Sequence, residues 1–173
     1  NVIDGYAHER IGDAFIGMQF IDDALASYAQ AVQNQRAPVP LLALREKLAQ
    51  VYLSAGDITN AIAQYDAILA TAQNEPYRAL IEYAAAKALV DAGQLDIGLS
   101  RMQRIFNNYP SQPAALDAMN TLIANGRELD AYQRGRVLYF REDYAAALTA
   151  FNEYTATVPL SEIPPELHLL LGR

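Results

Sequence analysis

The stretch Ala55-Gly56-Asp57-Ile58-Thr59-Asn60-Ala61-Ile62-Ala63-Gln64-Tyr65-Asp66-Ala67-Ile68 contains the pattern that decides the fold. It predicts a helix that ends at Gly56 and a second helix that starts at once, with Asp57 placed to cap its first N–H groups. In this second helix, small Ala61 and large Tyr65 lie four residues apart and therefore share one face. The stretch thus indicates the turn of a helical hairpin.

The same pattern recurs along the chain with a period of 37 residues. Four positions share this period, two of them small and two of them large. They are occupied by Gly12, Ala49 and Ala86; by Ala24, Ala61 and Gly98; by Tyr28, Tyr65 and Met102; and by Phe15, Tyr52 and Leu89. A fixed spacing at independent positions indicates an internal repeat.

Apolar residues in each copy fall at helical spacing, and no segment alternates apolar and polar residues as a half-buried strand would. The sequence therefore predicts helices over residues 4–18, 20–34, 40–54, 57–72, 76–92, 94–108, 112–125, 128–141 and 143–157, and one from about 163. Prolines are expected between these helices, where they cost no helical hydrogen bond.

The period slips after Gly98. Ala147 fits the small position of a second helix but lies 49 residues after Gly98, so the segment 112–125 reads as an extra helix. Alternatively, Gly135 continues the 37-residue series and 128–141 is itself a second helix. The first interpretation is favoured because the segment 143–157 matches the second-helix pattern better.

These hairpins resemble the tetratricopeptide repeat family, in which small residues let two helices approach and large residues fill the gaps. The resemblance covers nearly the whole chain. It implies an all-α fold, a single right-handed α-α superhelix (solenoid) over 1–173, with hairpins at about 4–34, 40–72, 76–108 and 128–157, an extra helix at 112–125 and a truncated repeat from 163. Departures from the family pattern are the 37-residue period, against about 34 residues, the extra helix and the missing tryptophan.

The resemblance implies a non-enzymatic scaffold that binds a peptide or protein segment on its concave face. A second resemblance, carried by residues 107–113, 130–135 and 144–154, is to the helical non-catalytic region of some bacterial lytic transglycosylases and to repeats of outer-membrane assembly lipoproteins. It implies the alternative of an accessory domain that acts at the cell wall, outside the cytoplasm.

Composition and spacing predict no enzyme. His8 and His168 lie at opposite ends of the chain, and the chain has no cysteine, so we expect neither a catalytic pair, a metal site nor a bound cofactor. A net charge of -7 argues against nucleic acid as a partner. The chain has no run of eighteen apolar residues, so we expect no insertion into a membrane.

The first helix of each copy is expected to line the binding groove. Counted from the small positions, the candidate contacts are Tyr6, Glu9 and Asp13; Glu46, Gln50 and Leu53; Tyr83, Lys87 and Asp91; and Tyr132, Arg136 and Tyr139. Tyr and Arg are favoured at interfaces, although Tyr83, Tyr132 and Tyr139 fit packing between repeats equally well. Some relatives bind a terminal carboxylate with a Lys/Asn/Arg clamp, and we predict no such clamp here because the corresponding residues are Glu9, Glu46, Gln50 and Tyr83.

The chain stops inside the first helix of a further repeat, with Gly172 placed 37 residues after Gly135. We therefore expect the parent protein to continue. Leu167, Leu169 and Leu170 would then lack their next partner, which predicts either disorder after Pro165 or self-association through this end.

Overall fold

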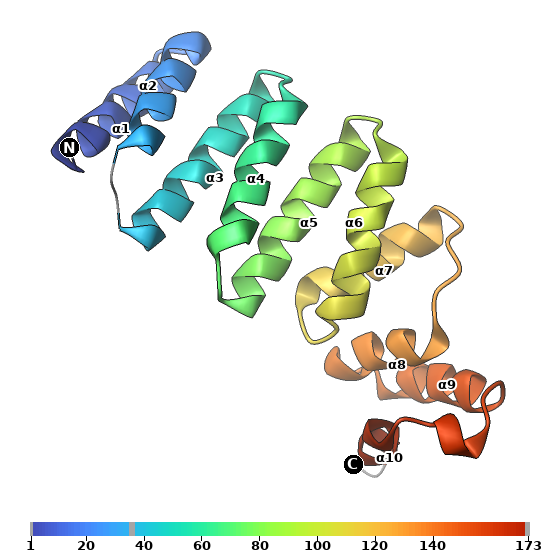
Figure 1. Ribbon diagram of the computed structural model, residues 1–173. Coiled ribbons are helices and arrows are strands. Elements are labelled where there is room, and N and C mark those ends of the chain that lie inside the picture. Colours follow the sequence, from blue (N-terminus) through green and yellow to red (C-terminus); the bar gives the residue numbers. More distant parts are fainter. Residues whose placement is uncertain (1, 35–36, 172–173) are drawn as a thin grey trace. The chain divides into compact units, whose positions relative to one another are not determined.

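The computed structural model describes residues 2–34 and 37–171, and within these ranges the protein is helical with no strand (Figure 1). The helices are α1 (Val2–Gly17), α2 (Ile21–Gln33), α3 (Pro38–Ser54), α4 (Ile58–Thr71), α5 (Glu75–Asp91), α6 (Leu95–Asn108), α7 (Pro113–Ala124), α8 (Ala131–Phe140), α9 (Tyr144–Thr155) and α10 (Pro165–Leu171), with a short 3-10 helix, η1 (Leu160–Glu162), before the last. Each predicted helix is present, with its ends within a few residues. None of the helices in the described ranges is both long and apolar enough to cross a membrane.

The chain divides into two compact units, residues 1–94 with α1–α5 and residues 95–173 with α6–α10. In unit 1 each helix packs against the next along the chain; in unit 2, α6 packs against α7 and α8 against α9. The helices that lie in the predicted hairpin ranges 4–34, 40–72 and 128–157 are α1 and α2, α3 and α4, and α8 and α9. The segment predicted as a hairpin at 76–108 comprises α5 and α6, which belong to different units.

Tight turns between helices use a backbone conformation with positive φ. Gly56, Gly93 and Gly126 have φ values of 77°, 79° and 71°, as expected for glycines that end a helix. Gln19 and Glu142 take the same place in the first and last hairpins, each with a φ of 63°. The turn geometry is therefore retained even where the chain has no glycine to relieve the steric cost.

Polar caps and prolines mark the helix starts. The predicted cap is present, because the Asp57 side chain accepts a hydrogen bond of 3.1 Å from the Asn60 N–H. The expectation that prolines lie between helices is wrong for Pro76 and Pro113, for example, which stand in the first turn of α5 and α7. A first-turn residue has no intrahelical N–H bond to lose, so proline is tolerated there.

Close packing of the two helices in a hairpin requires the small residues. A Cβ atom added at Gly12 would lie 2.7 Å from Cε1 of Tyr28, and one added at Gly135 would lie 2.3 Å from Cε1 of Phe151. Tyr28 and Phe151 are themselves buried. The aromatic ring of the second helix therefore rests directly on the backbone of the first helix.

This contact predicts that Gly12→Ala lowers the free energy of unfolding by about 1–3 kcal/mol, the usual cost of overpacking a core. Gly17→Ala is the matched control in the same helix, because a Cβ there meets no atom within 4 Å. Urea unfolding followed by circular dichroism would compare the two. Equal stability of both variants would contradict the proposed packing.

The C-terminal end differs from the sequence-based expectation. Pro165–Leu171 forms α10 rather than a disordered segment. Leu167 is completely buried and packs with Ala147 and Phe151, and Leu170 packs against the same cluster. The prediction that these two leucines lack a partner is therefore wrong, whereas Leu169 is 66% exposed. The repeat position at Gly172 lies outside the described residues.

Because Leu167 fills the core of the α8–α9–α10 cluster, Leu167→Ala should lower the stability of this part of unit 2 by about 2–5 kcal/mol. Leu169→Ala, its exposed neighbour on the same helix, should change the stability by less than about 0.5 kcal/mol. Amide hydrogen exchange in α8 and α9 reports the loss locally. Unchanged protection in Leu167→Ala would show that α10 does not pack as described.

Candidate functional site

The predicted groove residues of unit 1 occupy equivalent positions on three successive first helices. One position, three residues before the small residue, holds Glu9 of α1, Glu46 of α3 and Tyr83 of α5. The position just after the small residue holds Asp13, Gln50 and Lys87. We call the surface made by these six residues the first-helix face, and side-chain contacts between neighbouring helices connect it.

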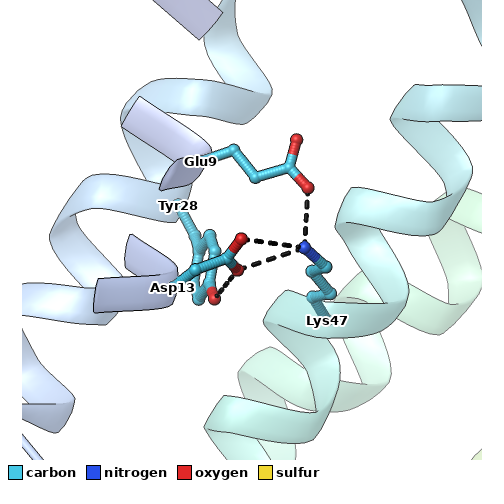
Figure 2. Close-up of polar contacts among 4 residues, drawn as sticks. All are labelled: Glu9, Asp13, Tyr28 and Lys47. Carbon is cyan, nitrogen blue, oxygen red and sulfur yellow. Dashed lines mark hydrogen bonds and ion pairs between the residues drawn. The ribbon is translucent and has the colours of Figure 1, made fainter. Parts of the chain in front are cut away.

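The contact between α1 and α3 is a cluster of four polar residues (Figure 2). The Lys47 ammonium donates to Glu9 Oε1 at 2.8 Å and to Asp13 Oδ1 at 3.1 Å. The Tyr28 hydroxyl of α2 donates to the same Asp13 oxygen at 2.7 Å. Two predicted ligand contacts, Glu9 and Asp13, are thus already bound to groups of the protein.

These contacts shift the pKa values of the cluster. Partial burial raises the pKa of Asp13, but the hydrogen bonds from Tyr28 and Lys47 outweigh it and hold the pKa below its usual value. Burial lowers the pKa of Lys47, yet the hydrogen bonds to Glu9 and Asp13 raise it overall. Burial and the Asp13 carboxylate together raise the pKa of Tyr28. The charged forms of Asp13 and Lys47 are therefore the stable ones at neutral pH.

The contact between α3 and α5 has a different composition. The Tyr77 hydroxyl of α5 donates to Glu46 Oε1 of α3. Burial, followed by this hydrogen bond, raises the pKa of Tyr77. Glu46 is half-buried. Here a predicted groove residue is bound by a neutral hydroxyl rather than by a lysine.

A cavity of about 430 Å³ opens beside Glu46 and Tyr77. Its walls are mainly apolar and come from the start of α3, with Pro38, Val39, Leu42 and Ala43, and from residues 71–74, which join α4 to α5. This cavity was not predicted from the sequence, because positions counted from the small residues do not include its walls. Ala43, one turn before Glu46, was the available signal, since a small residue there leaves space beside the carboxylate.

The other groove candidates of unit 1 are arranged in several ways. Gln50 is exposed and donates to the Tyr65 hydroxyl at 2.8 Å, whereas Lys87 forms an exposed ion pair of 2.6 Å with Asp91 of its own helix. Tyr6 is 44% exposed, and Tyr83 is half-buried. Leu53 is half-buried against a hydrophobic cluster. Gln50 and Lys87 are therefore the polar side chains of this face that are accessible to a ligand.

In unit 2 the corresponding residues contact α10. The Tyr132 hydroxyl donates to Glu166 Oε2 at 3.1 Å, and Arg136 Nη2 lies 3.6 Å from Glu166 Oε1. Burial and then the Glu166 carboxylate raise the pKa of Tyr132 to about 12. The ring of Tyr132 also lies 5.3 Å from that of Tyr154. The side chains of Tyr132 and Arg136 are thus engaged within the unit.

Tyr139 lies on the same helix, α8. Its ring contacts those of Phe140 and Tyr144, with centroids 5.8 Å and 5.5 Å away. Both Tyr132 and Tyr139 pack against the cluster formed by Ala147, Phe151 and Leu167. The rings of these two tyrosines therefore pack within unit 2.

Comparison with known proteins identifies the repeat. Residues 10–76 match the family model described as tetratricopeptide repeat. A crystal structure of nearly identical tetratricopeptide-like repeats, titled as a kinesin light chain of Podospora anserina, is similar with a TM-score of 0.51 and 16% identity, over 88% of this chain and 73% of that chain. No curated protein sequence matches. The resemblance to tetratricopeptide repeats is confirmed, as is the predicted all-α class of solenoid-forming hairpins.

The charged cluster on α1 and α3 predicts a dependence of stability on pH. The depressed pKa of Asp13 adds stability that is present above its usual value of 3.8 and is lost as the pH falls through the lower, folded-state value. The raised pKa of Lys47 adds stability below 10.5 that is lost as the pH rises through the folded-state value. The contribution should therefore be constant between about pH 5 and pH 9.

Lys47→Met should remove this contribution and lower the stability near pH 7 by less than about 1 kcal/mol, because Lys47 and Asp13 are partly exposed. The difference from the wild type should shrink as the pH falls through the lowered folded-state pKa of Asp13, where this carboxylate becomes protonated. Urea unfolding across this range measures it. A difference that persists at low pH would show that Lys47 acts through packing instead of charge.

Proposed function

We propose that this chain, a member of the class of tetratricopeptide-like helical arrays, is a non-enzymatic interaction module that binds a peptide or protein segment along the first-helix face of unit 1. Tetratricopeptide repeats generally mediate protein–protein interaction, and their scaffold is typically non-catalytic. In this chain the first-helix face of unit 1 would have this role.

The observation that carries the proposal is the combination of an apolar cavity with accessible polar groups on the same face. The cavity of about 430 Å³ lies beside Glu46, and Gln50 follows one turn later on α3. Lys87 on α5 is exposed as well. Binding sites for peptides and small ligands commonly join an apolar pocket to a few polar groups that fix orientation.

Unit 1 is favoured over unit 2 because α10 already binds the candidate residues of unit 2. Tyr132 and Arg136 contact Glu166 of α10, so a ligand would have to displace that carboxylate. The face of α3 next to the cavity needs no such displacement. A side chain of a peptide can therefore enter this cavity without displacing another helix of the unit.

The test is selection of twelve-residue peptides from a random display library on the immobilised chain, with retention on purified peptidoglycan measured in parallel. We expect the chain to enrich peptides and not to bind peptidoglycan. Gln50→Ala and Lys87→Ala should each weaken the selected peptides about 3- to 10-fold, which is up to about 1.4 kcal/mol. Thr59→Ala, an exposed residue of α4, is the control and should leave affinity unchanged.

Failure to enrich any peptide would contradict the proposal. Retention on peptidoglycan without peptide binding would instead support the accessory cell-wall domain that the second sequence resemblance implies. Enrichment of peptides whose binding is weakened by Thr59→Ala, but not by Gln50→Ala or Lys87→Ala, would place the site on the second helices and contradict the assigned face.

A further inference from the structure

Two equivalent carboxylates of unit 1 have different surroundings. Glu9 and Glu46 stand 37 residues apart at the same repeat position. Glu9 binds the Lys47 ammonium of the following first helix at 2.8 Å. The residue equivalent to Lys47 on α5, again 37 residues later, is Ala84. The second contact between first helices therefore lacks the lysine that neutralises the first one.

The basic residues near Glu46 that the structure describes bind other groups. Arg45 Nη1 donates to Gln64 Oε1 of α4 at 2.8 Å. Arg78, one residue after Tyr77, donates to the main-chain oxygens of Leu69 and Ala72. Lys47 binds Glu9 and Asp13 of α1. Among the described residues, Glu46 is thus bound only by the neutral Tyr77 hydroxyl, at Oε1, and its Oε2 is left for another donor.

A half-buried carboxylate without a cation is unfavourable compared with one that is paired, because burial weakens its hydration. The charge of unit 1 also favours a cationic ligand. Unit 1 contains eleven acidic and six basic residues, so its net charge is negative. Electrostatic complementarity of this kind selects the charge of a partner and speeds its association.

The cavity beside Glu46 supplies the apolar part of a site. Its volume of about 430 Å³ lies within the range of small-ligand pockets, roughly 300–1,000 Å³. Leu42 and Ala43 form a wall on α3, and Glu46 follows on the same helix. A side chain that enters the cavity therefore places the adjoining residue of its own chain near the carboxylate.

We propose that the cavity binds an apolar side chain of a peptide ligand while Glu46 binds a Lys or Arg next to it. This inference rests on the proposed function and specifies its ligand as a basic, apolar peptide segment. The ligand cation would take the place that Lys47 fills at Glu9. This charge preference also agrees with the prediction that the groove has no clamp for a terminal carboxylate.

The test compares twelve-residue peptides selected on the wild-type chain with those selected on Glu46→Gln. The variant keeps an oxygen for the Tyr77 hydroxyl and removes the charge. The wild type should enrich Lys or Arg beside Leu, Ile, Met or Phe, and Glu46→Gln should lose the preference for the basic residue. The strongest wild-type peptide should bind Glu46→Gln about tenfold more weakly, and its Arg→Gln or Lys→Gln version should bind both proteins equally.

Two further variants test the missing lysine and the cavity. Ala84→Lys supplies an internal cation and should weaken the basic peptide about tenfold, whereas Ala63→Lys adds the same charge at an exposed position of α4 and should change affinity less than twofold. Ala43→Trp fills the cavity and should abolish selection for the apolar residue. Circular dichroism and thermal unfolding confirm that each variant is folded.

The outcomes separate this inference from the proposed function. Peptides that bind through Gln50 or Lys87 but are insensitive to Glu46→Gln and Ala84→Lys would overturn the inference and leave the proposed function in place. Preference for acidic peptides would also overturn it. Failure to select any peptide on the wild-type chain would overturn both.

Discussion

The contact on which the structure depends is that of a large side chain on the second helix with a small residue on the first. Tyr28 lies against Gly12 so closely that no Cβ would fit between them, and Phe151 lies against Gly135 in the same way. This contact also fixes the polar chemistry, because the residue after the small one lies within reach of the tip of the ring. The Tyr28 hydroxyl accordingly binds Asp13, whereas Phe151 has no hydroxyl and Arg136 turns to Glu166. The packing rule of the repeat thus determines which side chains remain for a ligand.

Sequence differences between copies become functional differences because the backbone positions are equivalent. Lys47 connects two first helices through Glu9 and Asp13, and it leaves little charge on that part of the face unsatisfied. The next equivalent position holds Ala84 and therefore has no cation. There Glu46 binds the Tyr77 hydroxyl beside an apolar cavity, so the surface combines a polar and an apolar part. One repeat contact therefore holds two helices together, and the next is the one for which we propose ligand binding. A repeat array can vary its binding properties in this way without a change of fold.

The sequence predicted the helices well because each boundary has a local cause. Gly56 and Asp57 end one helix and begin the next by backbone and capping chemistry alone, so no tertiary information was needed. The site was predicted less completely. Counting from small residues gave Glu46 and Gln50 as candidates, but it did not predict the cavity, since a cavity depends on the packing of α3 against the segment between α4 and α5. The burial of Leu167 was also not predicted, because it depends on the packing of α10 against α8 and α9 rather than on a further repeat.

The central claim is that the carboxylate of Glu46 and the adjoining cavity form the part of unit 1 that recognises a ligand. A crystal structure of the chain with a selected peptide tests this claim most directly. The peptide is expected to lie on α3 and α5 with an apolar side chain in the cavity and an ammonium or guanidinium nitrogen within about 4 Å of a Glu46 oxygen, the usual distance of an ion pair. A peptide bound across α2 and α4, with Glu46 still bound only to Tyr77, would contradict it.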